Sequence, residues 1–349
     1  MTDIRTVPTL DDVAKMAGVS TATVSRCINS PDRVVAETRS RVKHAIDQLG
    51  YTPNFGARVM AARRTFTIGA IIPTMENAIF ARGLQAFQET LHHKGYNLMV
   101  ASSNYRQTNE EEQIRSFVAR GADGVLLIGH DRDDSIYQYL EQQDVPSLIA
   151  WTFSQNAKHP SIGFDNKASM SALAMEVLSL GHTELAVISG ITKGNDRARQ
   201  RVDGVKDALM LKGLDVERLK VIETKYEIEA GGDAFQTLRS SDTPPSAVLC
   251  GNDVLAVGAI LRAKKLGLKV PEDVSITGFD DIQMAKIVEP NLTTVHVPHR
   301  EMGNRAAEEL IQMVEKKSFG SSKKLDTSVV IRASLGPAHK PKLTVAAGD

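Results

Sequence analysis

The spacing of apolar residues changes character near residue 65. Between residues 10 and 49 they recur every three or four positions, which is the period of an amphipathic helix. From Phe66 onward, short apolar runs of strand length alternate with amphipathic stretches long enough for helices. The pattern therefore predicts a small helical N-terminal part, followed by a larger α/β body.

The first helical pattern is bounded by good capping residues. Thr9 suits the N-cap position, with Asp12 three residues later in place of the Glu or Gln of a capping box. Gly18 can end this helix in a left-handed turn, and Ser20 can cap a second helix over residues 21–29. Two helices joined by a short turn containing Gly are the helix-turn-helix signature, although an ordinary two-helix corner has the same pattern.

The second helix leaves short hydrogen-bonding side chains on its outward face. Such side chains suit the base edges and phosphates of DNA. A third helical pattern follows, from about Glu37 to Leu49. The candidate DNA-binding residues in this part of the chain are Thr9, Ser20, Thr21, Ala22, Thr23, Ser25, Arg26, Asn29 and Arg33.

The body has the βαβ rhythm of a parallel sheet with helices on both faces. A first series predicts strands at 66–72, 96–102, 123–129 and 146–150, with a helix over 78–94. A second series alternates helices at 167–180, 198–212, 227–239 and 253–266 with strands at 184–190, 220–224, 246–250 and 274–280. Two series predict two subdomains with a cleft between them, where ligands bind beyond the carboxyl ends of the strands. Segment 292–298 is expected to cross back to the first subdomain, and 327–332 to the second.

Composition and charge fit this plan. The chain has 349 residues, 42% of them hydrophobic, which is enough for two or three domains with a sizeable core. Lys and Arg outnumber Asp and Glu over residues 1–64, whereas the whole chain has no net charge, so a basic head precedes an acidic body. No run approaches the roughly 18 apolar residues of a membrane span, and the N-terminus is no signal peptide. We therefore expect a cytoplasmic protein with no membrane contact, in which Cys27 and Cys250 are buried.

Motifs along most of the chain resemble one family. DVAKMAGVSTATVSRCIN followed by LGYTPN resembles the head of the LacI/GalR family of bacterial transcription regulators. IGAIIP, DGVLLIG, LGHTELAVISG, AVLCGNDVLAVGAI, KVPEDVSITGFDD and LTTVHVP resemble its body, in the same order. The resemblance implies an N-terminal all-α helix-turn-helix DNA-binding head and an α/β periplasmic-binding-protein-like body. That body would consist of two Rossmann-like subdomains with a small effector between them.

The resemblance also divides the chain into domains. It implies a DNA-binding domain at 1–52, a hinge helix and linker at 53–65, an effector-binding and dimerisation domain at 66–340 and a tail at 341–349. The N-subdomain would span about 66–163 and 293–325, and the C-subdomain about 164–290 and 327–338. Three hinge residues, Asn54, Ala57 and Met60, are further DNA-binding candidates, with Met60 where the family commonly inserts a Leu into the minor groove.

The candidate effector-binding residues lie at predicted strand ends and helix starts. The family match implies that Arg201 grips a carboxylate or hydroxyls, although it could be a surface Arg instead. Asp280 is the match for an acidic contact to ligand hydroxyls, although it or Asp281 could cap the next helix. Asn252 matches a ligand contact and is equally suited to cap the helix over 253–266.

The remaining candidates are aromatic or basic. Phe80 and Tyr226 match walls of the family's pocket, although Phe80 also fits the core face of its helix. Trp151 stands where several relatives have Asp, which indicates a platform for ring stacking or a smaller cleft. Arg197, beside Arg201, favours an acidic effector such as a sugar acid.

The sequence thus predicts an effector-responsive transcriptional regulator that binds a pseudo-palindromic double-stranded DNA operator as a homodimer. We expect a repressor of a carbohydrate or sugar-acid catabolic operon. The alternatives are a purine- or phosphosugar-responsive regulator that uses its ligand as corepressor and, with less support, an enzyme fused to a helix-turn-helix. No catalytic motif or metal-ligand spacing is recognisable, so we expect neither enzyme activity nor a cofactor.

Overall fold

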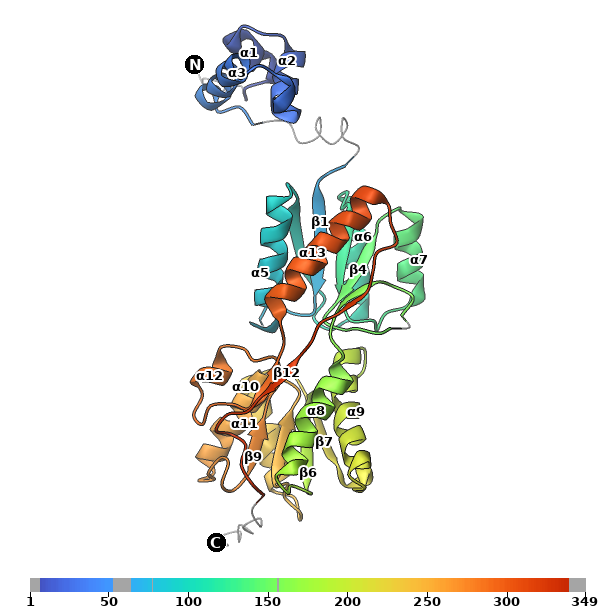
Figure 1. Cartoon of the computed structure of the whole chain (residues 1–349), viewed down its shortest axis with the longest axis vertical. Helices are drawn as coiled ribbons and strands as arrows, with labels where there is room; N and C mark the ends of the chain where they lie inside the picture. Colours follow the sequence, from blue (N-terminus) through green and yellow to red (C-terminus); the bar gives the residue numbers. More distant parts are fainter. Residues whose placement is uncertain (1–6, 53–63, 77, 156, 339–349) are drawn as a thin grey trace, which may run out of the picture. The chain divides into compact units, whose positions relative to one another are not determined.

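The chain forms two compact units, residues 1–65 and 66–349, here called the head and the body. The computed structural model describes residues 7–52, 64–76, 78–155 and 157–338 (Figure 1). No helix within these ranges is long and apolar enough to cross a membrane. Residues 53–63 of the predicted hinge and linker (53–65) and the tail from 341 lie outside the described residues.

The described part of the head contains three α-helices. They are α1 (Leu10–Ala17), α2 (Thr21–Asn29) and α3 (Ala36–Leu49), with a 3-10 turn, η1 (Pro31–Arg33), after α2. The caps are those that the sequence predicts: Thr9 and Asp12 form a capping box, and Gly18 ends α1 with φ of 64°. The Ser20 hydroxyl accepts from the backbone amide of Thr23 and so caps α2.

The head encloses its own small core. Val13 and Ala14 of α1, Val24 and Cys27 of α2, and Val42 of α3 are buried against one another. Because Ala14 and Ala17 are small, α1 can pack closely on its neighbours. The core is formed by the inward faces of the helices, so the residues on the outward faces of α1 and α2 do not contribute to it.

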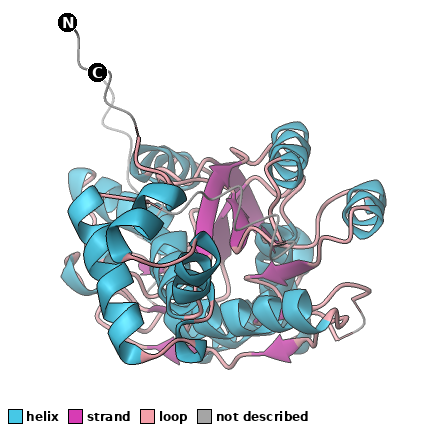
Figure 2. Cartoon of the chain, turned by 90° about the horizontal axis from the view of Figure 1, so that it is seen from above, coloured by secondary structure: helices cyan, strands magenta, loops and turns pink. Residues whose placement is uncertain are grey.

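The first lobe of the body is built on a six-stranded parallel sheet with the order β11-β5-β4-β3-β1-β2. Its strands are β1 (Thr67–Ile72), β2 (Asn97–Ser102), β3 (Gly124–Ile128), β4 (Ser147–Ala150), β5 (Ser161–Gly163) and β11 (Lys323–Lys324). Its helices are α5 (Ala78–His93), α6 (Gln107–Ala119), α7 (Asp134–Gln142) and α13 (His299–Lys316). The strands predicted in the first series are all confirmed, and helices flank the sheet (Figures 1 and 2).

The second lobe contains a four-stranded parallel sheet, β7-β6-β8-β9. Its strands are β6 (Leu185–Gly190), β7 (Lys220–Thr224), β8 (Ala247–Cys250) and β9 (Ser275–Thr277). Its helices are α8 (Asn166–Ser179), α9 (Asp196–Leu211), η2 (Val216–Arg218), α10 (Ile228–Arg239), α11 (Asp253–Lys265) and α12 (Met284–Ile287). Each predicted helix and strand of the second series is present, with ends displaced by a few residues.

A two-stranded antiparallel ribbon joins the lobes. It consists of β10 (Thr294–His296) and β12 (Ser328–Val330), which lie in the segments predicted to cross between subdomains. The two segments pair with each other. The edge of the first sheet is formed by β5, before the chain enters the second lobe, and by β11, after it returns, and neither strand is predicted from the sequence. Strands of two or three residues are too short to give a detectable alternating pattern.

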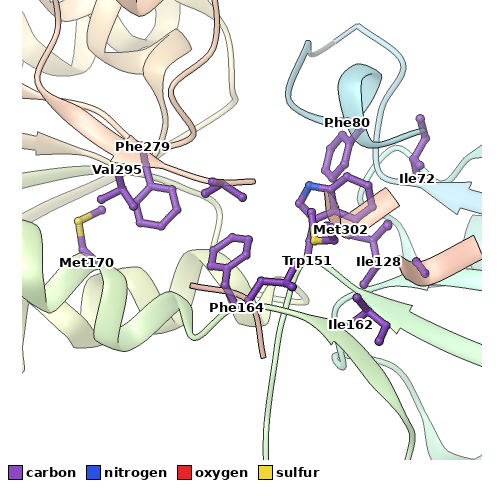
Figure 3. Close-up of a cluster of buried hydrophobic side chains, with 14 of the residues drawn as sticks. Ile72, Phe80, Ile128, Trp151, Ile162, Phe164, Met170, Phe279, Val295 and Met302 are labelled. Carbon is purple, nitrogen blue, oxygen red and sulfur yellow. The ribbon is translucent and has the colours of Figure 1, made fainter. Parts of the chain in front are cut away.

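A hydrophobic cluster runs from one lobe to the other, as Figure 3 shows. Trp151, Phe80 and Met302 pack in the first lobe, whereas Phe279 packs in the second. Phe164 lies between these groups and stacks on Phe279 with ring centroids 6.0 Å apart. The lobes therefore meet through an apolar contact directly beside the strand ends where the cleft is expected.

Candidate functional site

Helix α2 offers an exposed polar face on the head. Thr21, Ala22 and Arg26 are exposed, as is Arg33 on the turn that follows. Ser25 is half-buried beside them. An exposed helix face with short side chains and one guanidinium has the shape and chemistry to enter a major groove.

Three of the DNA-binding candidates also hold the head together. Thr9 caps α1, Ser20 caps α2, and the hydroxyls of Ser20 and Thr23 are 2.9 Å apart. A capping hydroxyl at a helix N-terminus can still face a phosphate, so their contact with DNA stays a prediction. The side chain of Asn29, together with Asn54, Ala57 and Met60, lies outside the described residues.

Arg201 lies on α9 and is buried inside the body. Its Nε donates to Oδ1 of Asn166 at 2.9 Å, and its Nη1 donates to the carbonyl of Gly251 at 2.6 Å. The guanidinium carbon lies 3.8 Å from the ring centroid of Phe279. The alternative of a surface Arg is therefore wrong, because packing and two hydrogen bonds hold this side chain in the cleft.

Asp280 faces Arg201 at the end of the strand segment that contains β9. One of its carboxylate oxygens lies 3.6 Å from Nη2 of Arg201 and 3.9 Å from Nε2 of His299. Within the described part of the chain, neither carboxylate oxygen accepts a hydrogen bond, although the side chain is completely buried. The carboxylate is therefore held at the cleft with its hydrogen-bonding capacity unused.

The suggestion that Asp281 caps the following helix is wrong. Its two oxygens accept from Arg332 at 2.6 Å and pair with His296 at 2.9 Å. Helix α12 has no side-chain cap, so Asp280 does not cap it either. These hydrogen bonds also hold the pKa of Asp281 below its usual value despite partial burial.

Asn252 does cap a helix, as one of its two interpretations predicts. Its Oδ1 accepts from the backbone amide of Leu255 at 2.9 Å, at the start of α11. Its buried Nδ2 has no partner among the residues that the structure describes. The hydrogen bond to Oδ1 therefore fixes the orientation of the Asn252 side-chain amide, including its Nδ2 donor.

Trp151 follows β4 and is buried, with a left-handed backbone at φ of 63°. Its ring meets Phe80 edge to face, with centroids 5.4 Å apart, and its centroid lies 6.4 Å from that of His299. Figure 3 shows Phe80 packed against Trp151, so the core interpretation of Phe80 is confirmed. The indole is thus part of the apolar packing of the first lobe, and its effect on the size of the cleft stays a prediction.

The two lobes touch at the mouth of the cleft. Arg199 of α9 makes two hydrogen bonds to Asp131, of 2.7 and 2.8 Å, and the backbone amide of His130 donates to Asp196 at 2.9 Å. Asp196 also pairs with Arg197 at 2.9 Å. A pocket at this mouth is lined by Pro73, Ser103, Tyr105, Arg106, Gln107, Glu110, Ile128, Asp131, Gly194 and Arg197.

Tyr226 and Tyr105 approach each other from opposite lobes, with ring centroids 5.8 Å apart. Burial raises the pKa of both phenols, so both are neutral hydrogen-bonding groups at physiological pH. The sequence analysis names Tyr226 but misses Tyr105. Because Tyr105 follows the predicted strand over 96–102, the rule that ligands bind beyond strand ends could have found it.

His299 and Asp253 were also missed. His299 begins α13 and is buried near Asp280, and burial lowers the pKa of its imidazole. Asp253 accepts from Thr294 at 2.6 Å and from the amide of Ile282 at 2.8 Å. Burial, with Asp280 nearby, raises the pKa of the Asp253 carboxyl well above its usual value. Contacts with residues far away in the sequence bring His299 and Asp253 to the cleft. The pattern of a single sequence does not reveal such contacts.

Family profiles match both parts of the chain. The profile for bacterial regulatory proteins of the lacI family matches residues 9–54, and that for a periplasmic binding protein-like domain matches 174–335. The chain is 33% identical over 333 residues to the HTH-type transcriptional repressor CytR of Escherichia coli, covering 94% of this chain and 96% of the relative. It is 31% identical over 314 residues to the catabolite control protein A of Priestia megaterium, covering 90% and 95%.

The fold has close solved counterparts. A crystal structure of the Lac repressor dimer bound to operator and the anti-inducer ONPF has a TM-score of 0.84 and 25% identity, covering 94% of this chain and 99% of that one. CytR is named as a transcriptional repressor, and the solved structure is that of a repressor bound to its operator. The chain therefore belongs to the LacI family of bacterial regulatory proteins, and it is an effector-responsive, sequence-specific DNA-binding transcriptional regulator.

Proposed function

We propose that the chain is a homodimeric, cytoplasmic repressor in which a small effector in the cleft controls operator binding. The proposal rests on the presence, in one chain, of a candidate DNA-binding face in the head and a candidate ligand site in the body. The head presents an exposed recognition face around Arg26, and the body buries polar groups, chief among them Asp280, that make no hydrogen bond to any described residue.

The head supports the DNA-binding half of the proposal. Two copies would place two α2 helices in major grooves one helical turn apart, so the operator would be a pseudo-palindrome. Arg26 and Thr21 would face base edges, and the caps Thr9 and Ser20 would face the phosphates. Asn29, Arg33 and the hinge residues Asn54, Ala57 and Met60 are proposed to extend this surface, with Met60 as an apolar wedge at the operator centre.

The body supports the control half. The lobes are bridged by Arg199 with Asp131 and by His130 with Asp196, all at the cleft mouth. An effector that binds both lobes changes the balance between open and closed arrangements, because it binds one of them better. A coupling of about 1–3 kcal/mol between effector and operator is the usual size for such a system.

The relatives indicate the range of effectors. One solved structure similar to this chain is a complex of the regulator CelR with cellobiose, with a TM-score of 0.69 and 27% identity. We propose a carbohydrate or sugar-acid effector that relieves repression, bound by Arg197, Arg201, Asn252, Asp280 and the aromatic side chains of Phe80, Trp151 and Tyr226. The alternative is a purine or phosphosugar that acts as corepressor, as the similarity to PurR repressors suggests, at 33% identity for that of Pasteurella multocida.

The test begins with selection of binding sites from random double-stranded DNA by the full-length protein. We expect a two-fold symmetric site bound by a dimer. Affinity for that site is then measured with sugars, sugar acids, sugar phosphates and nucleobases present. Weaker binding identifies an inducer and tighter binding a corepressor, whereas an asymmetric site bound by a monomer contradicts the proposal. Consumption of any of these compounds would support a fused enzyme instead.

A further inference from the structure

One aromatic ring closes the first-lobe side of the cleft. The side chain of Trp151 is only 1% exposed, and neighbouring side chains surround it. Phe80 meets it edge to face, and a Cβ on Gly83 would lie 2.6 Å from the indole ring. Glycine at position 83 therefore makes room for the indole, and α5 and the ring are matched to each other.

The indole N–H of Trp151 is a buried hydrogen-bond donor. The indole Nε1 has no hydrogen-bond partner among the described residues, and the same holds for both oxygens of Asp280 and for Nδ2 of Asn252. Figure 3 shows the indole nitrogen on the side of the ring toward the second lobe. Burying a polar group without a partner costs free energy, so a set of such groups around one cleft indicates a ligand that satisfies them.

The charges in the cleft are already balanced. Asp280 lies 3.6 Å from Arg201, and Asp196 lies 2.9 Å from Arg197. The guanidinium of Arg201 is further committed to Asn166 and to the carbonyl of Gly251. An anionic ligand would add a negative charge beside the buried carboxylate of Asp280, which is unfavourable at low dielectric.

The same contacts limit the size of the ligand. Phe80, Trp151 and His299 on one side are buried, and so are Arg201, Asn252 and Asp280 on the other. These six side chains can all be nearly inaccessible only if the space between them is small. A second sugar ring would have to displace the indole, which Phe80 and α5 hold in place.

We propose that Trp151 is the specificity-determining residue of the cleft, restricting it to a neutral hydroxylated ligand no larger than one monosaccharide. The indole N–H donates a hydrogen bond to this ligand, whose hydroxyls donate to Asp280. The proposal rests on the proposed function, since it assumes that the effector binds in this cleft. It narrows the range of effectors given above and excludes sugar acids.

The first experiment uses the full-length protein and the fluorescence of Trp151, which is the single Trp of the chain. The probes are D-ribose, D-glucose and D-galactose, the matched acids D-gluconate, D-galactonate and D-glucuronate, the disaccharides lactose and cellobiose, and hypoxanthine. We expect at least one neutral monosaccharide to shift the Trp emission and raise the unfolding temperature. A response confined to acids, disaccharides or hypoxanthine overturns the proposal, and so does the absence of any response or stabilisation without a change in emission.

The second experiment tests the indole itself with the neutral probe that responds, and it measures affinity by titration calorimetry because the Trp151 variants have no Trp fluorescence. Trp151→Phe keeps an aromatic ring but removes the N–H, and we expect about a tenfold weaker affinity, the equivalent of one hydrogen bond. Trp151→Ala should admit a disaccharide that the original chain rejects. Tyr96→Phe is the matched control, because it removes one polar atom from a buried ring elsewhere in the same lobe and should leave affinity unchanged. Unchanged affinity in Trp151→Phe would overturn the proposal, provided that the variant unfolds at the original temperature.

Operator binding separates this proposal from the proposed function. Each preparation is also tested for binding to the selected DNA site without any probe. If the original chain binds a palindromic site but responds only to acids, the proposed ligand class is wrong, whereas the proposed function as a transcriptional regulator still holds. If it binds no symmetric site, the proposed function fails whatever the fluorescence shows.

Discussion

The carboxylate of Asp280 lies 3.6 Å from the guanidinium of Arg201, and both side chains are buried. Removing one partner of such a pair leaves an uncompensated charge, which costs more than the pair itself contributes. A substitution in this pair is therefore expected to change both effector binding and the free energy of unfolding of the body.

Asp280→Asn is expected to destabilise the body by about 3 kcal/mol, because the charge of Arg201 stays buried without compensation. The measurement is urea unfolding of the full-length protein. Asp144→Asn is the control, since its partner Lys317 is exposed and the loss should be less than about 1 kcal/mol. Equal losses in the two variants would mean that the cleft pair is solvated.

Arg26→Ala is expected to weaken binding to the selected operator by about 1–3 kcal/mol and to affect nonspecific DNA much less, if Arg26 contacts a base edge. Affinities for operator and for random-sequence DNA are compared at one salt concentration. A similar loss on both kinds of DNA would make Arg26 a phosphate contact only. Lys94→Ala, in the body, should change neither.

The capping box of the head should depend on acid pH. Hydrogen bonds from Thr9 lower the pKa of Asp12 below its ordinary value of 3.8. A carboxyl whose folded pKa is lowered stabilises the fold above its unfolded pKa, and this contribution is lost as pH falls through the folded value. We therefore expect melting of the head to become easier below about pH 4. Asp12→Asn should flatten this part of the pH profile, and an unchanged profile would contradict the role of Asp12.

Asp131→Asn removes the partly exposed ion pair with Arg199 that bridges the lobes. We expect the free energy of unfolding to change by less than about 1 kcal/mol, because solvent screens the pair. The effector should nevertheless associate faster, since the mouth of the cleft opens more easily. Stopped-flow fluorescence with a responding ligand measures this rate, and Arg199→Ala should give the same increase. A double variant with twice the effect would show that the two residues act separately.

Local chemistry explains why the head could be predicted nearly to the residue. The capping roles of Thr9 and Ser20 and the left-handed turn at Gly18 depend on neighbours within four positions. Strands β1 and β3 are buried along their whole length, so their apolar runs are unmistakable. Arg201 was found because it matches a motif.

Other features of the cleft depend on contacts between distant segments. His299 approaches Asp280 only because α13 returns to the first lobe after the crossing ribbon. Asp281 looked like a helix cap, but Arg332, far along the chain, takes its carboxylate. The indole of Trp151 is fixed by Phe80 and by the missing side chain at Gly83, and no local pattern reveals that match.

The placement of α13 has a consequence for how the chain reaches its native state. This helix covers β3, β4 and β5 and packs along α5, yet it comes after most of the second lobe in the sequence. During synthesis, the apolar face of the first sheet stays exposed until residues 164–298 have been made and α13 follows them. Most of the second lobe is contiguous and is synthesised before α13, although Ser334 and Gly336 join it only afterwards. We therefore infer that the first sheet stays partly uncovered while most of the second lobe is made, and that a chaperone has most to protect there.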